Sequence, residues 1–167
     1  GEDGPACPAA AGRTARNSPM YGPPGVAYVY LNYGIHALFN IVTEPAGRPA
    51  AVLIRALEPR EGLSTMRRRR ARAAVGRRQV TGASIEEASL CRGPGNLTVA
   101  MGIGLGHNRA DLIGAQLYVE SAARPDGAVV WTPRIGISVG EDRLWRAVVD
   151  RHPCLSGGRN HLRRQTS

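Results

Sequence analysis

Residues 26–42 read VAYVYLNYGIHALFNIV, and this stretch decides the fold. Residues 26–31 are β-branched, aromatic or otherwise apolar, and residues 35–42 resume that character after Asn32-Tyr33-Gly34. β-branched and aromatic residues favour strands, and an Asn and a Gly between two such runs are typical of a tight turn. The stretch therefore predicts a β-hairpin.

Most aromatic residues of the chain lie in or beside this hairpin: Tyr21, Tyr28, Tyr30, Tyr33 and Phe39. Along a strand, Tyr28 and Tyr30 share one face, while Val29 and Leu31 share the other. A tyrosine pair on one face is more often a core cluster with its hydroxyls at the rim, but it can also be a stacking platform for a nucleobase. Tyr33 has little core within reach at the tip, which makes it a candidate wedge between base pairs.

Further elements are expected on both sides of the hairpin sequence. Residues 1–25 indicate an extended loop, residues 50–57 a third strand and residues 60–74 a helix. A helix capped by Ser84 is expected to end at Gly93-Pro94-Gly95, and a short helix is expected to follow as far as Met101. Strand-like apolar runs come next, at residues 116–121, 129–131, 133–137 and 144–149. Strands mixed with peripheral helices, without regular alternation, indicate an α+β domain.

Two polar residues interrupt the apolar strands. Asn40 needs hydrogen-bond partners if it is buried, so its amide either reads the edge of a purine or satisfies the backbone. Arg55 is too costly to bury without a partner, and a carboxylate is expected nearby. Glu58 would point to the opposite face of a continued strand, so the identity of that carboxylate is not obvious from the sequence.

The charge balance indicates a polyanionic partner. The 22 basic residues are all arginine and outnumber 13 acidic residues, which gives a net charge of +9. A GC-rich genome explains arginine in place of lysine but not the surplus of basic residues, and nucleic acid is favoured over an anionic membrane because no amphipathic anchor is visible. In the run of arginines 67–70, two are expected in a solvated helix end and the others are free to contact phosphates.

Other classes of protein do not fit the composition. No apolar run approaches the roughly 18 residues that a membrane helix needs. The three cysteines are widely spaced and the four histidines are scattered, so neither a disulfide framework nor a metal site is expected.

Several short motifs occur in a fixed order along the chain: Met20-Tyr21-Gly22-Pro23-Pro24-Gly25, then Tyr28-Val29-Tyr30-Leu31-Asn32-Tyr33-Gly34 with Asn40, then Leu53-Ile54-Arg55-Ala56-Leu57-Glu58-Pro59, then Leu90-Cys91-Arg92-Gly93-Pro94-Gly95-Asn96-Leu97, and Pro133-Arg134-Ile135-Gly136-Ile137. In this order they resemble the alkyladenine (3-methyladenine) DNA glycosylase family, also called methylpurine glycosylases. The resemblance implies one mixed domain over residues 1–157, with a curved, mostly antiparallel sheet, peripheral helices and a protruding hairpin that enters the minor groove of DNA. Residues 158–167 are expected to form a basic, disordered tail.

The resemblance also implies roles for individual residues. Tyr33 corresponds to the tyrosine that intercalates in place of the flipped nucleotide, Tyr30 to the aromatic residue that stacks on the flipped base, and Asn40 to the asparagine that discriminates among purines. Arg55 corresponds to the arginine beside the catalytic water, and the backbone of Ile135 to a carbonyl that helps to hold this water. DNA contacts are implied for His36, Arg13, Thr14, Arg16 and Arg92. The family needs no metal and no organic cofactor.

The implied function is base excision repair, in which a monofunctional glycosylase flips an alkylated purine out of double-stranded DNA and hydrolyses its N-glycosidic bond. The resemblance places the catalytic glutamate directly before Gly1, so residues 1–167 are expected to be an N-terminally incomplete domain with little or no activity by themselves. Pro8 stands where the family has a pocket histidine. The alternative is a catalytically inactive DNA-binding protein on the same scaffold. The protein is expected to be monomeric and cytoplasmic, associated with the nucleoid in a bacterium, with no membrane contact.

Overall fold

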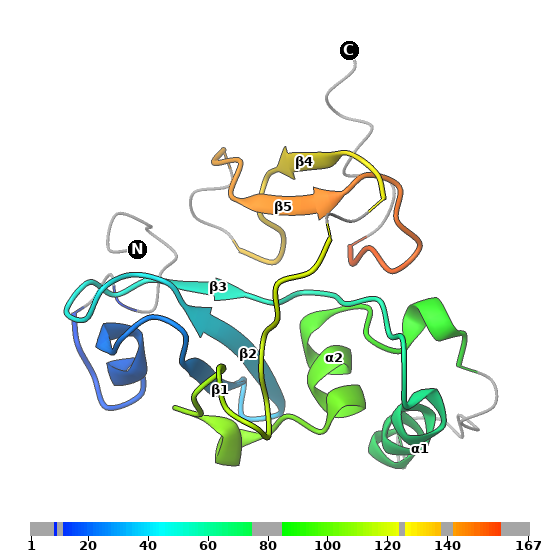
Figure 1. Ribbon diagram of the computed structural model, residues 1–167, viewed down its shortest axis with the longest axis horizontal. Coiled ribbons are helices and arrows are strands. Elements are labelled where there is room, and N and C mark those ends of the chain that lie inside the picture. Colours follow the sequence, from blue (N-terminus) through cyan, green and yellow to red (C-terminus); the bar gives the residue numbers. More distant parts are fainter. Residues whose placement is uncertain (1–8, 10–11, 75–84, 124–125, 138–141, 158–167) are drawn as a thin grey trace.

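The predicted hairpin is the centre of the fold (Figure 1). Strands β1 (Ala27–Asn32) and β2 (His36–Val42) pair in antiparallel fashion, and β3 (Ala51–Leu53) pairs with the other edge of β2. The computed structural model describes residues 9, 12–74, 85–123, 126–137 and 142–157.

The turn of the hairpin holds a tyrosine in an unfavourable backbone conformation. The amide of Ile35 donates to the carbonyl oxygen of Asn32 at 3.1 Å. Between them Tyr33 has φ 51° and Gly34 has φ 70°, so both central residues are left-handed, as in a type I′ turn. A residue with a Cβ loses about 1–2 kcal/mol in this conformation. The side chain of Tyr33 is 90% exposed, so the tip of the hairpin protrudes into solvent.

Each face of the hairpin packs against a different part of the chain. On one face, Ala27, Val29 and Phe39 join a core with helices α1 (Leu63–Ala73) and α2 (Pro94–Met101). On the other face, a smaller cluster forms with the one-turn 3-10 helix η1 (Ser18–Tyr21) and adjoining residues, and its buried members are Ala9, Met20, Tyr28 and Val42. Because the side chains of a strand alternate in direction, the two faces have different neighbours and different chemistry.

A second antiparallel sheet, of β4 (Val129–Thr132) and β5 (Arg146–Val149), is drawn above β3 in Figure 1. The α+β class and the antiparallel pairing are therefore confirmed, with the strands divided between two sheets. No helix in the described ranges is both long and apolar enough to cross a lipid bilayer.

Some predicted elements are wrong. β3 ends at Leu53, because the chain then leaves β2 and Ala56 forms a bridge with Arg92. Residues 116–121 and 133–137 form no strand. The first run makes a single backbone hydrogen bond, from Val119 to the carbonyl oxygen of Leu112 (2.9 Å), which is too little for a ladder among the described residues, and the second is interrupted by a left-handed Gly136 (φ 73°).

The predicted helix after residue 84 is also wrong, since only the 3-10 turn η3 (Glu87–Ser89) forms among the described residues. The chain turns at once to bring buried Leu90 and Cys91 into the core. Ser84 and the tail at residues 158–167 lie outside the described residues.

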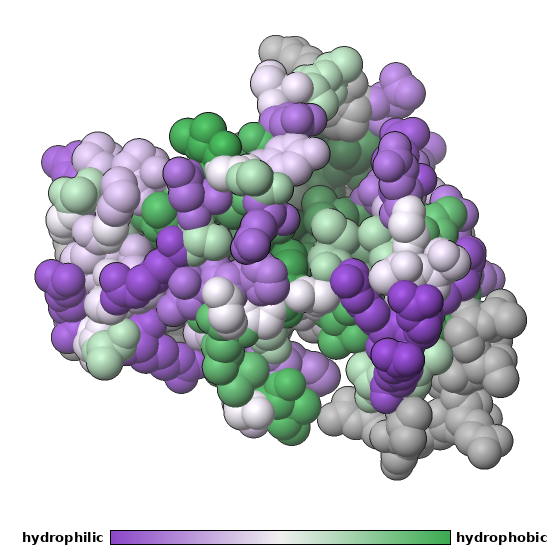
Figure 2. Space-filling model, turned by 60° about the horizontal axis from the view of Figure 1, so that its bottom comes forward, coloured by the Kyte–Doolittle hydropathy of each residue, from purple (hydrophilic) through white to green (hydrophobic). Residues whose placement is uncertain are grey.

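The arginines of α1 bind neighbouring backbone more than the sequence suggests. Arg69 donates to the carbonyl oxygen of Ala100 in the last turn of α2 (3.0 Å), and Arg70 donates to two carbonyl oxygens just before α2 (3.1 and 2.6 Å). Arg67 reaches a further carbonyl at 3.4 Å. Hydrophilic side chains cover this end of the molecule, on the right of Figure 2, yet much of the arginine run serves to join helices.

Candidate functional site

The face of the hairpin that points away from α1 and α2 carries the predicted base site. Tyr28 lies opposite Asn40 in the strand pairing, and Tyr30 lies opposite Leu38, so all four side chains share this face. The rings of Tyr28 and Tyr30 are 5.1 Å apart at their centroids and tilted by 33°. Tyr28 is buried in the core, whereas Tyr30 is only half-buried. The core interpretation thus holds for Tyr28, and Tyr30 lies at the rim, where a ligand could reach it.

Asn40 is buried and uses its amide nitrogen for the backbone. Its Nδ2 donates to the carbonyl oxygen of Tyr28 at 3.0 Å and to that of Leu38 at 3.4 Å. This is the backbone alternative left open by the sequence. The amide oxygen Oδ1 forms no hydrogen bond to any residue of the described ranges, so an acceptor is still available beside Tyr30.

The predicted DNA-binding residues of the N-terminal segment lie along the same face. Arg16 places its Cζ 4.8 Å from the centroid of the Tyr30 ring and donates from Nη2 to the carbonyl oxygen of Leu31 (3.0 Å). Arg13 stacks in the same way on Tyr21, at 5.4 Å.

A local turn holds these arginines in place. The amide of Thr14 donates to Oδ1 of Asn17 (2.6 Å), and the amide of Asn17 donates to Oγ1 of Thr14 (3.2 Å). Asn17 is buried and also donates to the carbonyl oxygen of Gly12. This reciprocal pairing fixes the segment between Arg13 and Arg16. Both side chains therefore project along the hairpin face that carries Tyr28 and Tyr30, here called the tyrosine face.

Arg55 lacks the carboxylate partner that the sequence predicts. It lies just after β3, its Nε is buried, and no carboxylate of the described residues pairs with it. Glu58, the nearest acidic residue in sequence, pairs with Arg60 at 2.7 Å. Burial lowers the pKa of Arg55, Arg146 lowers it further, and Tyr30 partly opposes the shift. A half-buried cation without an anion is therefore left beside the tyrosine face.

Arg146 is a second buried cation near this position, and the sequence prediction missed it. It is 5% exposed and donates to Oγ1 of Thr132 (3.1 Å) and to the carbonyl oxygen of Ser156. Burial lowers its pKa. Arg146 is a single arginine within the apolar run of residues 144–149, as Arg55 is within residues 50–57. The same sequence pattern could therefore have predicted both buried cations.

Ile135 comes close to Arg146 through Gly157. A Cβ at Gly157 would overlap the side chain of Ile135 and lie 3.9 Å from Nη2 of Arg146. The absence of a side chain at Gly157 therefore lets the loop after β4 pack against the C-terminal segment. Ile135 and the buried cations belong to one neighbourhood, built from segments far apart in the sequence.

The remaining predicted DNA contacts lie elsewhere. His36 begins β2 next to the turn and packs on α2, where a Cβ at Gly95 would lie 3.2 Å from its ring. Arg92 donates from Nη2 to the carbonyl oxygen of Pro153 (2.6 Å), so it holds the C-terminal segment in this structure. Tyr33 and His36 therefore belong to the hairpin tip, and Arg92 belongs to a separate junction.

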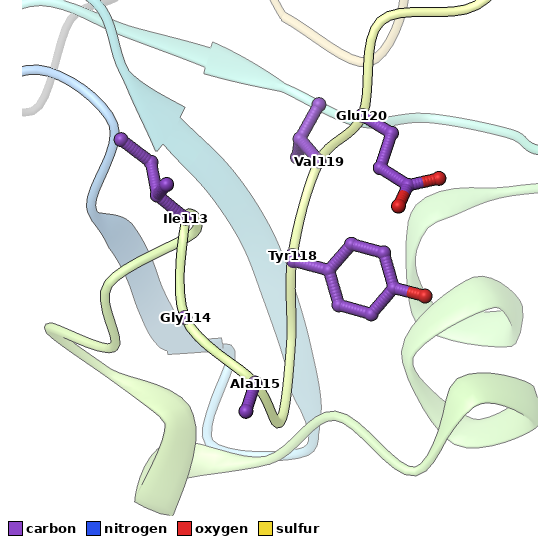
Figure 3. Close-up of a pocket in the computed structure, with 6 residues that line it drawn as sticks. All are labelled: Ile113, Gly114, Ala115, Tyr118, Val119 and Glu120. Atoms are coloured by element: carbon purple, nitrogen blue, oxygen red, sulfur yellow. The ribbon is translucent and has the colours of Figure 1, made fainter.

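A shallow pocket of about 330 Å³ lies in the loop after Leu112, and its lining residues are shown in Figure 3: Ile113, Gly114, Ala115, Tyr118, Val119 and Glu120. The loop folds back on itself, with Ile113 and Tyr118 pointing to opposite sides (Figure 3). None of the predicted site residues lines this pocket. Within the described ranges, no three His, Cys, Asp or Glu side chains gather as a metal site would require.

Comparison with known proteins agrees with the motifs. The family model described as Methylpurine-DNA glycosylase (MPG) matches residues 1–153. A protein of Rubrobacter xylanophilus is 45% identical over 146 residues, covering 87% of this chain and 70% of its own length. Proteins of Chlorobium phaeobacteroides (46% over 156 residues, covering 91% and 71%) and Chlorobaculum tepidum (41% over 157 residues, covering 93% and 69%) are also similar. All three bear the name "Putative 3-methyladenine DNA glycosylase". With its motifs, hairpin and family match in agreement, this chain belongs to the methylpurine-DNA glycosylase family.

Proposed function

We propose that this protein is a DNA repair glycosylase that flips alkylated purines of the 3-methyladenine type out of duplex DNA and hydrolyses their N-glycosidic bond. One observation carries the proposal most directly, namely the exposed Tyr33 at the tip of the hairpin. Its ring is 90% exposed and its backbone is left-handed, so folding alone would favour Asn or Gly at this position. An aromatic residue kept there at a cost in stability fits a wedge that fills the gap left by a flipped nucleotide.

The tyrosine face supplies the chemistry for recognising the base. Alkylation of a purine ring nitrogen places positive charge on the base, and a cationic ring stacks well on the electron-rich face of Tyr30. The free Oδ1 of Asn40 would accept a hydrogen bond from the base edge and so discriminate among purines. Damaged base pairs also open at lower cost than intact ones, which adds selectivity before the base reaches the site.

Hydrolysis requires a water molecule held against the sugar carbon and a general base to activate it. The guanidinium of Arg55, which has no carboxylate partner among the described residues, would hold an anionic or polar group beside that water, and the carbonyl oxygen of Ile135 would accept a hydrogen bond from the water. The proposed reaction is monofunctional and hydrolytic, with water attacking the sugar carbon.

The proposed partner is double-stranded DNA, bound by a monomer in the cytoplasm, close to the nucleoid in a bacterium. The net charge of +9 and the arginines along the tyrosine face support binding to a polyanion. Binding without catalysis is the second candidate function, and the substitution of Pro8 for the pocket histidine favours it.

A binding experiment tests the role of the hairpin. We expect Tyr33→Ala to weaken binding to a duplex with a tetrahydrofuran abasic-site analogue more than binding to single-stranded DNA, because only the duplex must be held open. Tyr118→Ala is the matched control, since it removes another exposed tyrosine (55%) from a loop outside the site. Equal losses on duplex and single strand would mean that Tyr33 is not a wedge.

An activity measurement separates the two candidate functions. We expect the full-length gene product to release 3-methyladenine from methylated DNA, and Arg55→Ala to lower the rate of release by about tenfold or more. Absence of release, together with Tyr33-dependent duplex binding, would support the non-catalytic alternative.

A further inference from the structure

The free protein covers the ring on which a flipped base is proposed to stack. The guanidinium of Arg16 lies over the Tyr30 ring, 4.8 Å from its centroid, and the hydrogen bond from Nη2 to the Leu31 carbonyl (3.0 Å) holds it there. A guanidinium is planar and cationic, like an alkylated purine, and it makes the same kind of contact with an aromatic face. Arg16 therefore occupies the face of the Tyr30 ring on which a cationic base is proposed to stack.

Of the two described side chains that pack on the Tyr30 ring, Arg16 is the one that can give way. Tyr28, at 5.1 Å between ring centroids, is 1% exposed and belongs to the core cluster, so moving it would disrupt the fold. Arg16 is exposed, and within the described ranges it is held by a backbone hydrogen bond and a cation–π contact. A base that stacks on Tyr30 must therefore displace Arg16.

We propose that Arg16 is an access-controlling residue, which occupies the stacking face of Tyr30 in the DNA-free protein and leaves it when a flipped base enters. This inference rests on the proposed base-stacking role of Tyr30. On Tyr30 or displaced from it, the guanidinium keeps its charge and attracts the phosphates of the bound strand. Arg16 thus competes with the base for Tyr30 and also contributes to binding of the backbone.

The association constants for two modified duplexes measure this competition. In a duplex with a tetrahydrofuran abasic-site analogue no base enters the site, so Arg16 can stay on Tyr30. In a duplex with 3-deaza-3-methyladenine, a stable isostere of the alkylated base, Arg16 must leave. Loss of Arg16 removes its positive charge, and with it the attraction to DNA phosphates, from both complexes, but it relieves the competition only in the second. The ratio of the two association constants isolates the competition.

We expect the ratio of base-containing to abasic association constants to rise about two- to fivefold in Arg16→Ala, which corresponds to the strength of an exposed cation–π contact. Arg16→Lys should raise the ratio as well, because lysine keeps the charge but stacks less well, and it should retain more affinity for the abasic duplex than Arg16→Ala. Arg13→Ala is the matched control. It removes the same charge from the same segment, but its guanidinium lies on Tyr21, so the ratio should stay at the wild-type value.

Two outcomes contradict the inference in distinguishable ways. An unchanged ratio in both Arg16 variants, with wild-type protein still preferring the modified duplexes to undamaged DNA, would overturn the role of Arg16 and leave the proposed function standing. If wild-type protein shows no preference for either modified duplex over undamaged DNA, the proposed function fails and the role of Arg16 fails with it.

Discussion

The single residues of the proposed site are ones that folding alone would not favour at their positions. Tyr33 is left-handed and almost fully exposed, Asn40 is a buried amide within an apolar strand, and Arg55 is a half-buried cation whose Nε is shielded from solvent. The sequence predicts a functional role at each of these positions, because an aromatic residue at a hairpin tip and a polar residue within an apolar strand are both unfavourable for folding. Arg146 is unfavourable in the same manner, and it was missed only because the run around it is short.

Replacing Tyr33 by asparagine should separate its two effects. We expect Tyr33→Asn to raise the free energy of unfolding by up to about 1 kcal/mol, because Asn tolerates the left-handed conformation better, and to weaken binding to abasic-site duplex. Urea unfolding and a binding titration on the same protein measure both quantities. Tyr118→Asn, at an exposed tyrosine without a positive φ, should bring no gain in stability. A clear loss of stability in Tyr33→Asn would mean that the ring packs on the protein.

The buried thiols make stability depend on pH in the alkaline range. Burial raises the pKa of Cys91 and of Cys154 above the ordinary value of 9.0. Below 9.0 both thiols are protonated in the folded and unfolded states. As pH rises through 9.0 toward the raised values, thiols ionise first in the unfolded chain, so the free energy of unfolding should fall.

Urea unfolding at intervals from pH 7 to 10 tests this dependence. The double variant Cys91→Ala, Cys154→Ala should lose less stability over the alkaline half of that range than the wild-type protein does. Equal losses in the two proteins would assign the pH dependence to other groups.

At the scale of elements, the arginines of helix α1 join it to neighbouring segments as well as giving it a positive charge. Arg69 and Arg70 bind carbonyl groups of the segments around α2, and these contacts lie on the side of the hairpin opposite the tyrosine face. The sequence could show that four arginines in a row do not share one face of a helix. It could not show which carbonyl groups would be in reach, because this depends on tertiary packing.

Substitutions in α1 should distinguish structural from exposed arginines. We expect Arg70→Ala to lower the free energy of unfolding by about 1.5–3 kcal/mol, since it loses charge-assisted hydrogen bonds to two carbonyl groups. Arg72→Ala, at an exposed position of the same helix, should change stability by no more than about 0.5 kcal/mol. Similar effects of the two substitutions would show that the hydrogen bonds of Arg70 add little.

At the scale of the whole molecule, long-range proximity is the part that the sequence did not predict. The hairpin, α1 and the α+β class follow from local pattern, because strong β-formers and a turn signal agree along residues 26–42. The strands predicted at residues 116–121 and 133–137 do not form, because the first run makes too little backbone pairing for a ladder and the left-handed Gly136 interrupts the second. The approach of Arg146 and Ile135 to the region of Arg55 joins segments some eighty or more residues apart, and no local signal encodes it.

The overall charge should appear in the salt dependence of DNA binding. If Arg13 and Arg16 contact phosphates, each change to alanine should reduce the slope of log K against log salt concentration by about 0.9. Arg72→Ala removes the same charge from α1, on the other side of the hairpin, and should leave the slope unchanged. An equal reduction in all three variants would indicate that the protein binds DNA through its net charge rather than through the tyrosine face.

Because β1 packs on both faces, the proposed base site depends on the number of residues in this strand. Tyr28 and Tyr30 alternate with Ala27 and Val29, so each residue of the site lies next to a residue of the main core. Inserting one residue within the strand would exchange the two sets, turning the tyrosines toward the helices and the small apolar side chains toward the proposed base site. Substitutions can therefore change that site one side chain at a time, whereas a change of length within the strand would disrupt the site and the core together.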